Sequence, residues 1–242
     1  KMLEVIGRLY DDQALTQQAA QVRKAIVEQS YDGEFFVDNA VRGKGGKLEV
    51  TRNRTETCQY YAFYLGTATP QSHPELWAKM MNEFGPVRQT SKAYPESHPS
   101  NAFIGNYLRM ELLSSEGRSK QILEENQSYY LPMARQTGTL WENMTTSASC
   151  NHGFAAHMAR VLYRDVLGVY DISPTEKKVT LRFTDCGLKH CKGSIPVGNE
   201  SVDVEWAMQD GQMDVSLKLP QGYTYEHTSP GLSSCTITTK ND

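Results

Sequence analysis

The spacing of apolar residues in this 242-residue chain changes once, near Gly168. Before this point, apolar residues recur every three or four positions, which is the spacing of helices that bury one face. After it, apolar and polar residues alternate, which is the spacing of strands with one buried face. We therefore predict a mainly α plus β fold with two domains, a helical domain at residues 1–171 and a β domain at residues 172–242.

The helical domain is predicted to consist of hairpins joined by long loops. Gly-Pro at positions 85–86 gives one helix a firm end. Residues 1–10 have helical spacing without a capping residue before them, so we expect the chain to be part of a longer protein. Residues 34–50 are predicted to form a loop. The predicted helices cover residues 12–30, 55–66, 74–85, 101–115, 119–128 and 153–167.

The β domain is predicted to be a small antiparallel β-sandwich. Apolar residues alternate with polar ones at 179–183, 202–208 and 213–219. Asp210-Gly211 lies between the last two of these strands and is typical of a hairpin turn. We expect one face of this sheet to be exposed to solvent and the β domain to pack on the helices.

Charge and composition exclude several kinds of partner. The net charge of −3 is spread along the chain without a basic cluster, which excludes electrostatic capture of nucleic acid or an anionic membrane. No apolar run reaches the roughly 20 residues that a membrane span needs. A neutral or small polar ligand fits this composition better.

The cysteine and glycine patterns do not predict a metal or a cofactor. The five cysteines are scattered, and an odd number leaves one unpaired within the chain. Cys186 and Cys191 flank His190, but no second ligand pair follows at the spacing of a zinc finger. The glycine cluster at 43–46 lacks the Walker pattern of a phosphate-binding loop.

Two short motifs carry the candidate chemistry. Thr139-Leu140-Trp141-Glu142 is followed, ten residues from its start, by Ser149-Cys150-Asn151-His152-Gly153-Phe154 at the start of a predicted helix. A sugar-cleaving site needs a carboxylate to handle a proton or water, an aromatic ring beside the sugar, and a polar donor for its hydroxyls. The alternative interpretation is structural, with Trp141 as a buried anchor beside a solvated charge.

These motifs, followed by Gly-Val-Tyr ahead of the β domain, resemble the C-terminal part of the bacterial α-L-rhamnosidases. That family consists of inverting glycoside hydrolases with an (α/α)6 barrel followed by a β-sandwich. The resemblance implies a partial (α/α)6 barrel here, with Glu142 as the general base that activates water. It also implies that His152 contacts the sugar and that Trp141 forms a wall of the pocket. It favours a periplasmic or secreted location, which the residues themselves leave open.

The chain departs from the family pattern in two respects. The general acid of the family lies in an acidic, arginine-containing motif, and no segment here matches it. The resemblance therefore implies that the remainder of the barrel, from a missing N-terminal part, is a required partner and that this chain alone is inactive. The interval between Trp141-Glu142 and His152 is also shorter than is common in the family.

In such a barrel the inner helices present the same end to one rim. Helices that begin near residues 55, 101 and 153 would be the inner ones. We therefore predict that Glu56, His98 and Asn101 contact the sugar beside Glu142 and His152. The rim would also carry Arg52, Asn53 and Arg54. The structural alternatives are that Glu56 is an acid favoured by the helix dipole and that Asn101 is an N-cap.

The predicted function is hydrolysis of terminal α-L-rhamnosyl linkages with inversion, on a rhamnose-containing glycoside and without a cofactor. Two alternatives remain open. Another (α/α)6 glycosidase, such as a fucosidase, trehalase or glucoamylase relative, would share the helical hairpins. A non-catalytic carbohydrate-binding module would also suit the aromatic residues and the β domain.

Overall fold

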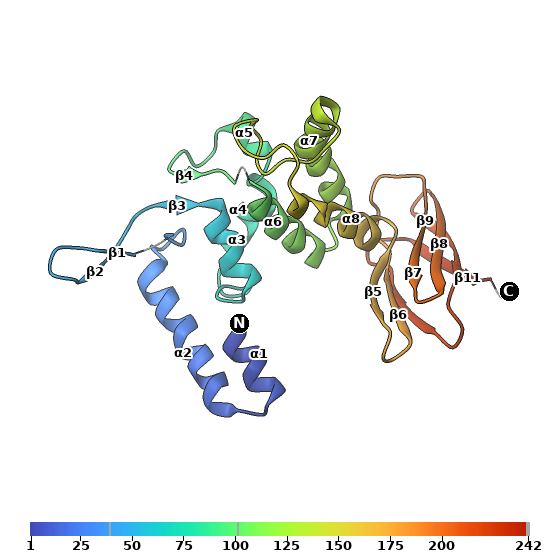
Figure 1. Cartoon of the computed structure of the whole chain (residues 1–242), viewed down its shortest axis with the longest axis horizontal. Helices are drawn as coiled ribbons and strands as arrows, with labels where there is room; N and C mark the ends of the chain where they lie inside the picture. Colours follow the sequence, from blue (N-terminus) through green and yellow to red (C-terminus); the bar gives the residue numbers. More distant parts are fainter. Residues whose placement is uncertain (39, 101, 241–242) are drawn as a thin grey trace. The chain divides into compact units, whose positions relative to one another are not determined.

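The computed structural model describes residues 1–38, 40–100 and 102–240 (Figure 1). The chain divides into two compact units, unit 1 (Lys1–Leu112) and unit 2 (Leu113–Asp242). Helices and sheets both occur, so the predicted α plus β fold class is confirmed. The predicted domain boundary at residue 171, the partial barrel and the sandwich stay predictions.

Unit 1 contains two helical hairpins. Asp12 caps the second helix by accepting hydrogen bonds from the N–H groups of Ala14 and Leu15. Thr55 caps α3 by accepting one from Cys58, which confirms the helix start predicted there. The helices are α1 (Met2–Leu9), α2 (Gln13–Ser30), α3 (Glu56–Tyr64), α4 (Pro74–Glu83) and the short α5 (Val87–Ser91), and α6 (Phe103–Ser115) runs across the unit boundary.

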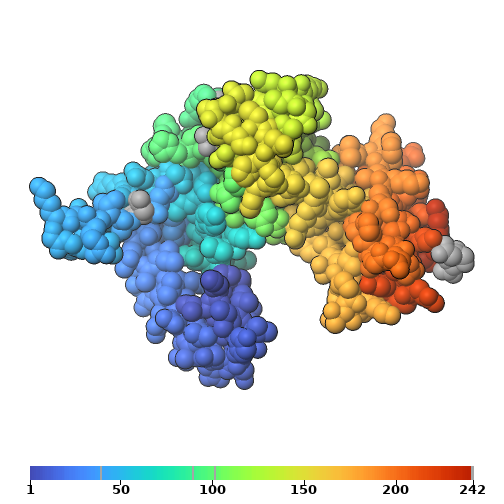
Figure 2. All heavy atoms as spheres, viewed as in Figure 1, coloured from blue at the N-terminus to red at the C-terminus, as the bar shows by residue number. Residues whose placement is uncertain are grey.

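The predicted loop at residues 34–50 contains a hairpin instead. Strand β1 (Ala40–Arg42) pairs antiparallel with β2 (Leu48–Val50), and every residue of both strands is exposed. Strands are predicted from the alternation of apolar, buried residues with polar, exposed ones, and this hairpin has no such alternation. It projects from the rest of unit 1 in Figures 1 and 2. A second small sheet pairs β3 (Arg54–Thr55) in parallel with β4 (Ser97–His98).

Unit 2 begins with a helix that is longer than predicted. Helix α7 (Ser119–Thr137) continues past residue 128 because Tyr129, Tyr130 and Met133 are buried along it. The single helix predicted at 153–167 is a composite. It consists of a 3-10 turn at Gly153–Ala156, α8 at His157–Val161 and a π-helical turn at Leu162–Val166.

Gly168 connects this helix to the sheets at a position where only glycine fits. Its φ is 93°, and a Cβ atom there would lie 2.4 Å from the ring of Phe183. The buried Asp165 joins the same helix to the sheet. Its carboxylate bonds Arg182 at 2.8 Å and Arg164 at 2.9 Å.

The β module of unit 2 consists of two sheets that share one core, in which Trp206 donates from its indole N–H to the carbonyl of Val166. The hairpin predicted at Asp210-Gly211 is confirmed. The pairings of β5 with β6, β7 with β8 and β8 with β9 are antiparallel, as predicted, whereas β10 pairs with β6 and β11 with β9 in parallel, which the prediction did not include. The sheet orders are β10-β6-β5 and β11-β9-β8-β7. The strands are β5 (Val169–Ser173), β6 (Lys178–Arg182), β7 (His190–Val197), β8 (Glu200–Gln209), β9 (Gln212–Lys218), β10 (Thr224–Thr228) and β11 (Ser234–Thr239).

No helix within the described residues is long and apolar enough to cross a membrane. The same residues contain no group of three His, Cys, Asp or Glu side chains placed to hold a metal ion.

All five cysteines are free thiols. Burial, aided by the neighbouring Asp38 carboxylate, raises the pKa of the Cys58 thiol to about 12. Because the thiolate is the reactive form, we expect iodoacetamide at pH 8 to modify Cys58 at least about tenfold more slowly in the native chain than in urea. Mass spectrometry of quenched samples measures both rates. Equal rates would show that Cys58 is not enclosed as described.

Candidate functional site

The two motifs of unit 2 form one folded loop. Gly138 ends α7 in the left-handed conformation, with φ at 74°. The N–H of Glu142 then donates to the carbonyl of Ser149, and the N–H of His152 donates to the carbonyl of Leu140, both at 2.9 Å. These two bonds hold residues 140–142 beside 149–152. The loop therefore brings Glu142 and His152 onto neighbouring stretches of backbone.

Trp141 anchors this loop in the interior. Its side chain is 4% exposed and lies in a cluster with Tyr129, Tyr130, Met133 and Ala155. Its indole N–H donates to the hydroxyl of Thr137 at 2.7 Å. The structure thus places the indole in the core under the loop, and a role as a wall of the pocket stays a prediction.

Glu142 directly follows this anchor and is half-buried. Its Oε2 accepts one long hydrogen bond, 3.4 Å, from the N–H of Ser149. A carboxylate has about four acceptor positions, so this contact leaves capacity for a water molecule. The fixed backbone on both sides limits the positions that the carboxylate can take.

His152 is the N-cap of the 3-10 turn and is half-buried. Its Nδ1 accepts a hydrogen bond from the N–H of Phe154 at 3.3 Å. In a neutral imidazole this places the proton on Nε2, which makes Nε2 a donor. A donor of this kind suits a sugar hydroxyl.

Glu56 lies in unit 1 and is fully enclosed, with 0% of its surface exposed. One carboxylate oxygen bonds the guanidinium of Arg88 at 2.7 Å, and the other accepts from Ser100 N–H at 3.0 Å and from the Tyr60 hydroxyl at 3.1 Å. Arg88 in turn donates to the carbonyl of Ser97. Glu56 therefore fixes the segment that carries His98, and it offers no surface to a sugar in this structure.

His98 and Asn101 are the other two residues that were predicted, with Glu56, to contact the sugar. His98 is exposed and lies in β4, opposite Thr55 of β3. Asn101 lies outside the described residues. Because Glu56 and His98 belong to unit 1 and Glu142 and His152 to unit 2, their meeting at one rim stays a prediction.

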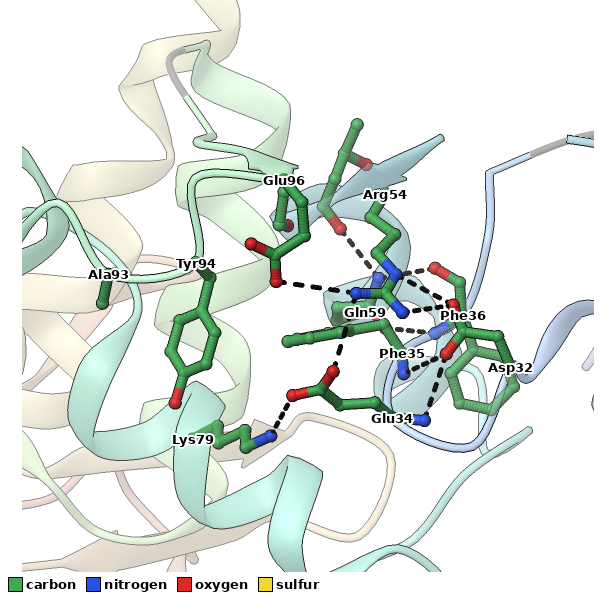
Figure 3. Close-up of polar contacts among 12 residues, drawn as sticks. Asp32, Glu34, Phe35, Phe36, Arg54, Gln59, Lys79, Ala93, Tyr94 and Glu96 are labelled. Atoms are coloured by element: carbon green, nitrogen blue, oxygen red, sulfur yellow. Dashed lines mark hydrogen bonds and ion pairs between the residues drawn. The ribbon is translucent and has the colours of Figure 1, made fainter. Parts of the chain in front are cut away.

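Sequence reasoning missed a charged cluster around Arg54 (Figure 3). The guanidinium donates from Nε and Nη2 to Asp32 at 2.8 and 2.6 Å, and its Nη1 lies 3.6 Å from Glu34 and 3.5 Å from Glu96. It also stacks 4.8 Å above the centre of the Phe35 ring. Arg54 was predicted to lie on the rim, but its three carboxylate partners lie far from it in sequence.

The same cluster borders a hollow of about 590 Å³ in unit 1, which Arg52, Arg54, Asp32 and Glu96 help to line. Burial opposes the charge on Asp32, but donation from the Phe35 N–H and from Arg54 outweighs it and lowers the pKa of this carboxyl. Two arginines face two carboxylates here, so the wall is close to neutral in charge.

Comparison with known proteins finds similarity to two rhamnosidases. The chain matches no family model. It is 25% identical to a protein named alpha-L-rhamnosidase from Alteromonas sp. (strain LOR), over an alignment of 231 residues that covers 87% of this chain and 23% of that protein. Its fold matches a crystal structure of a GH78 family rhamnosidase from Bacillus sp. GL1 with a TM-score of 0.77 and 17% identity, over 94% of this chain and 24% of that one.

The predicted resemblance of this chain to the α-L-rhamnosidase family is therefore confirmed. The chain spans about a quarter of the length of the rhamnosidases that it matches.

Proposed function

We propose that the loop at residues 138–152 carries the water-activating part of an active site that hydrolyses terminal α-L-rhamnosyl linkages with inversion. The main support is the geometry of this loop. The half-buried Glu142 and His152 lie on two stretches of backbone that are joined by hydrogen bonds. The buried side chain of Trp141 anchors the loop in the core. The similarity to a protein named alpha-L-rhamnosidase supports rhamnose as the sugar.

In the proposed reaction, water attacks the anomeric carbon from the face opposite the leaving group. Glu142 accepts a proton from this water as the new C–O bond forms, and the glycosidic C–O bond breaks with its electron pair going to the leaving oxygen. A second carboxyl group, roughly 6.5 to 9.5 Å from the first, protonates that oxygen. The Nε2–H of His152 donates to a sugar hydroxyl and orients the ring.

We further propose that the second carboxyl group comes from a polypeptide segment outside residues 1–242. No stretch of this sequence matches the acidic, arginine-containing motif of the family's general acid. The chain by itself would then activate water without protonating the leaving group.

Both proposals are tested with two substrates whose leaving groups differ in whether they need a proton to depart. Fluoride departs without protonation, whereas an aryloxide departs more readily when an acid assists it. We expect the chain to hydrolyse α-L-rhamnosyl fluoride and to leave an aryl α-L-rhamnoside intact. Proton NMR of the fluoride reaction should show β-L-rhamnose first, because attack from the opposite face inverts the anomeric centre.

Each contrary outcome has a distinct meaning. Brisk release from the aryl rhamnoside would show that the chain contains its own acid. An intact fluoride substrate, with the chain folded by circular dichroism, would contradict the role of Glu142. Preferred hydrolysis of another glycosyl fluoride would favour a different (α/α)6 glycosidase.

A further inference from the structure

The β module contains a hollow of about 720 Å³. β10 and β11 are the end strands of their respective sheets. The hollow is lined by the connection from β9 to β10, with contributions from the end of β11 and the start of β8. Its volume lies within the roughly 300 to 1,000 Å³ typical of sites for small ligands.

One wall of the hollow is aromatic. Tyr225 lies in β10, and Tyr223 directly precedes this strand. Both are half-buried against the shared core and line the hollow with the rest of their surface. A tyrosine presents an apolar ring and a hydroxyl at once, which suits the C–H faces and hydroxyls of a sugar.

The polar groups of the hollow have an excess of positive charge. Lys218 and Lys240 contribute two ammonium groups, and Glu200 contributes the one carboxylate among the lining residues. That carboxylate already accepts a hydrogen bond from the N–H of Gln221 at 3.0 Å. The backbone N–H of Lys240 donates to the carbonyl of Leu217 at 2.8 Å. Its exposed side chain makes no hydrogen bond or ion pair within residues 1–38, 40–100 and 102–240.

We propose that this hollow binds an acidic saccharide, with a sugar ring on Tyr223 and Tyr225 and a carboxylate beside Lys240. The inference goes beyond the proposed catalytic function. None of the lining residues belongs to the loop at 138–152, so binding here does not require Glu142.

Titration with rhamnogalacturonan oligosaccharides, which alternate neutral and uronate units, tests the proposal. We expect binding by calorimetry, with chemical-shift changes at residues 218–225 by NMR. Tyr223→Ala should weaken binding about tenfold, the loss of one aromatic contact. Lys240→Met should weaken it about twofold to fivefold, as expected for one exposed charge. Methyl α-L-rhamnoside, which has no carboxylate, should bind more weakly.

Matched controls keep the result specific. Tyr163→Ala removes an exposed tyrosine and Lys189→Met an exposed lysine outside the hollow, and both should bind as the unchanged chain does. Glu142→Gln should also bind normally, which separates this site from the catalytic proposal. If Tyr223→Ala does not fold, the Lys240→Met variant still tests the proposal, because the side chain of Lys240 is exposed. Absence of binding, or binding that Lys240→Met leaves unchanged, would overturn the proposal.

Discussion

Glu142→Gln is expected to reduce hydrolysis of α-L-rhamnosyl fluoride by about 100- to 10,000-fold, the usual contribution of a general base. Glutamine has the same shape and can still accept the hydrogen bond from the Ser149 N–H, so the loop should keep its conformation. It cannot take a proton from water. Fluoride release and circular dichroism measure the two effects separately.

A matched control is Glu116→Gln, which changes an exposed glutamate elsewhere in unit 2 and should leave the rate unchanged. A second experiment uses Glu142→Gly with sodium azide. Azide is an anion that needs no base, so it should restore consumption of the fluoride and give β-L-rhamnosyl azide. More than a tenth of the original rate in Glu142→Gln would end the assignment of this residue as the base.

Glu56→Ala is expected to lower the free energy of unfolding of unit 1 by about 3 to 5 kcal/mol, the usual cost of removing one partner of a buried ion pair. The substitution leaves the enclosed guanidinium of Arg88 without its carboxylate. It also removes the acceptor of the Tyr60 hydroxyl and of the Ser100 N–H. Urea unfolding followed by circular dichroism measures the change.

The comparison variant is Glu75→Ala, which removes an exposed acid from the first turn of α4. It should cost less than about 1 kcal/mol, because an exposed acid near a helix N-terminus contributes little. Glu56→Ala combined with Arg88→Met should recover part of the lost stability, since no charge is then left buried alone. A cost for Glu56→Ala as small as that for Glu75→Ala would show that Glu56 is solvated.

Local signals in the sequence located several elements well. Thr55 both precedes a helical pattern and caps α3, and Asp210-Gly211 lies at the turn between β8 and β9 with both residues at positive φ. The parallel pairings of β10 with β6 and of β11 with β9 could not be predicted, because parallel and antiparallel strands share the period of two and no tight turn joins these strands. The end of α7 depends on packing of Tyr129 and Tyr130, which spacing alone did not reveal.

The candidate site was predicted in its residue types but not in its contacts. Trp141 and Glu142 were singled out together, yet only the structure shows that the indole is buried while the carboxylate is partly exposed. Glu56 was predicted from a helix start, which does not distinguish an exposed acid from one that closes a buried network. The three carboxylates around Arg54 lie 20, 22 and 42 positions away in the sequence, and no local pattern links them.

Two backbone hydrogen bonds, between Leu140 and His152 and between Glu142 and Ser149, hold the two sides of the loop together. The positions of Glu142 and His152 therefore do not depend on how many residues lie between the two sides. Residues 143–148 lie beyond the last of these bonds and include the exposed tip at 145–147. Insertion or deletion of residues at this tip would therefore leave the carboxylate and the imidazole at their present separation.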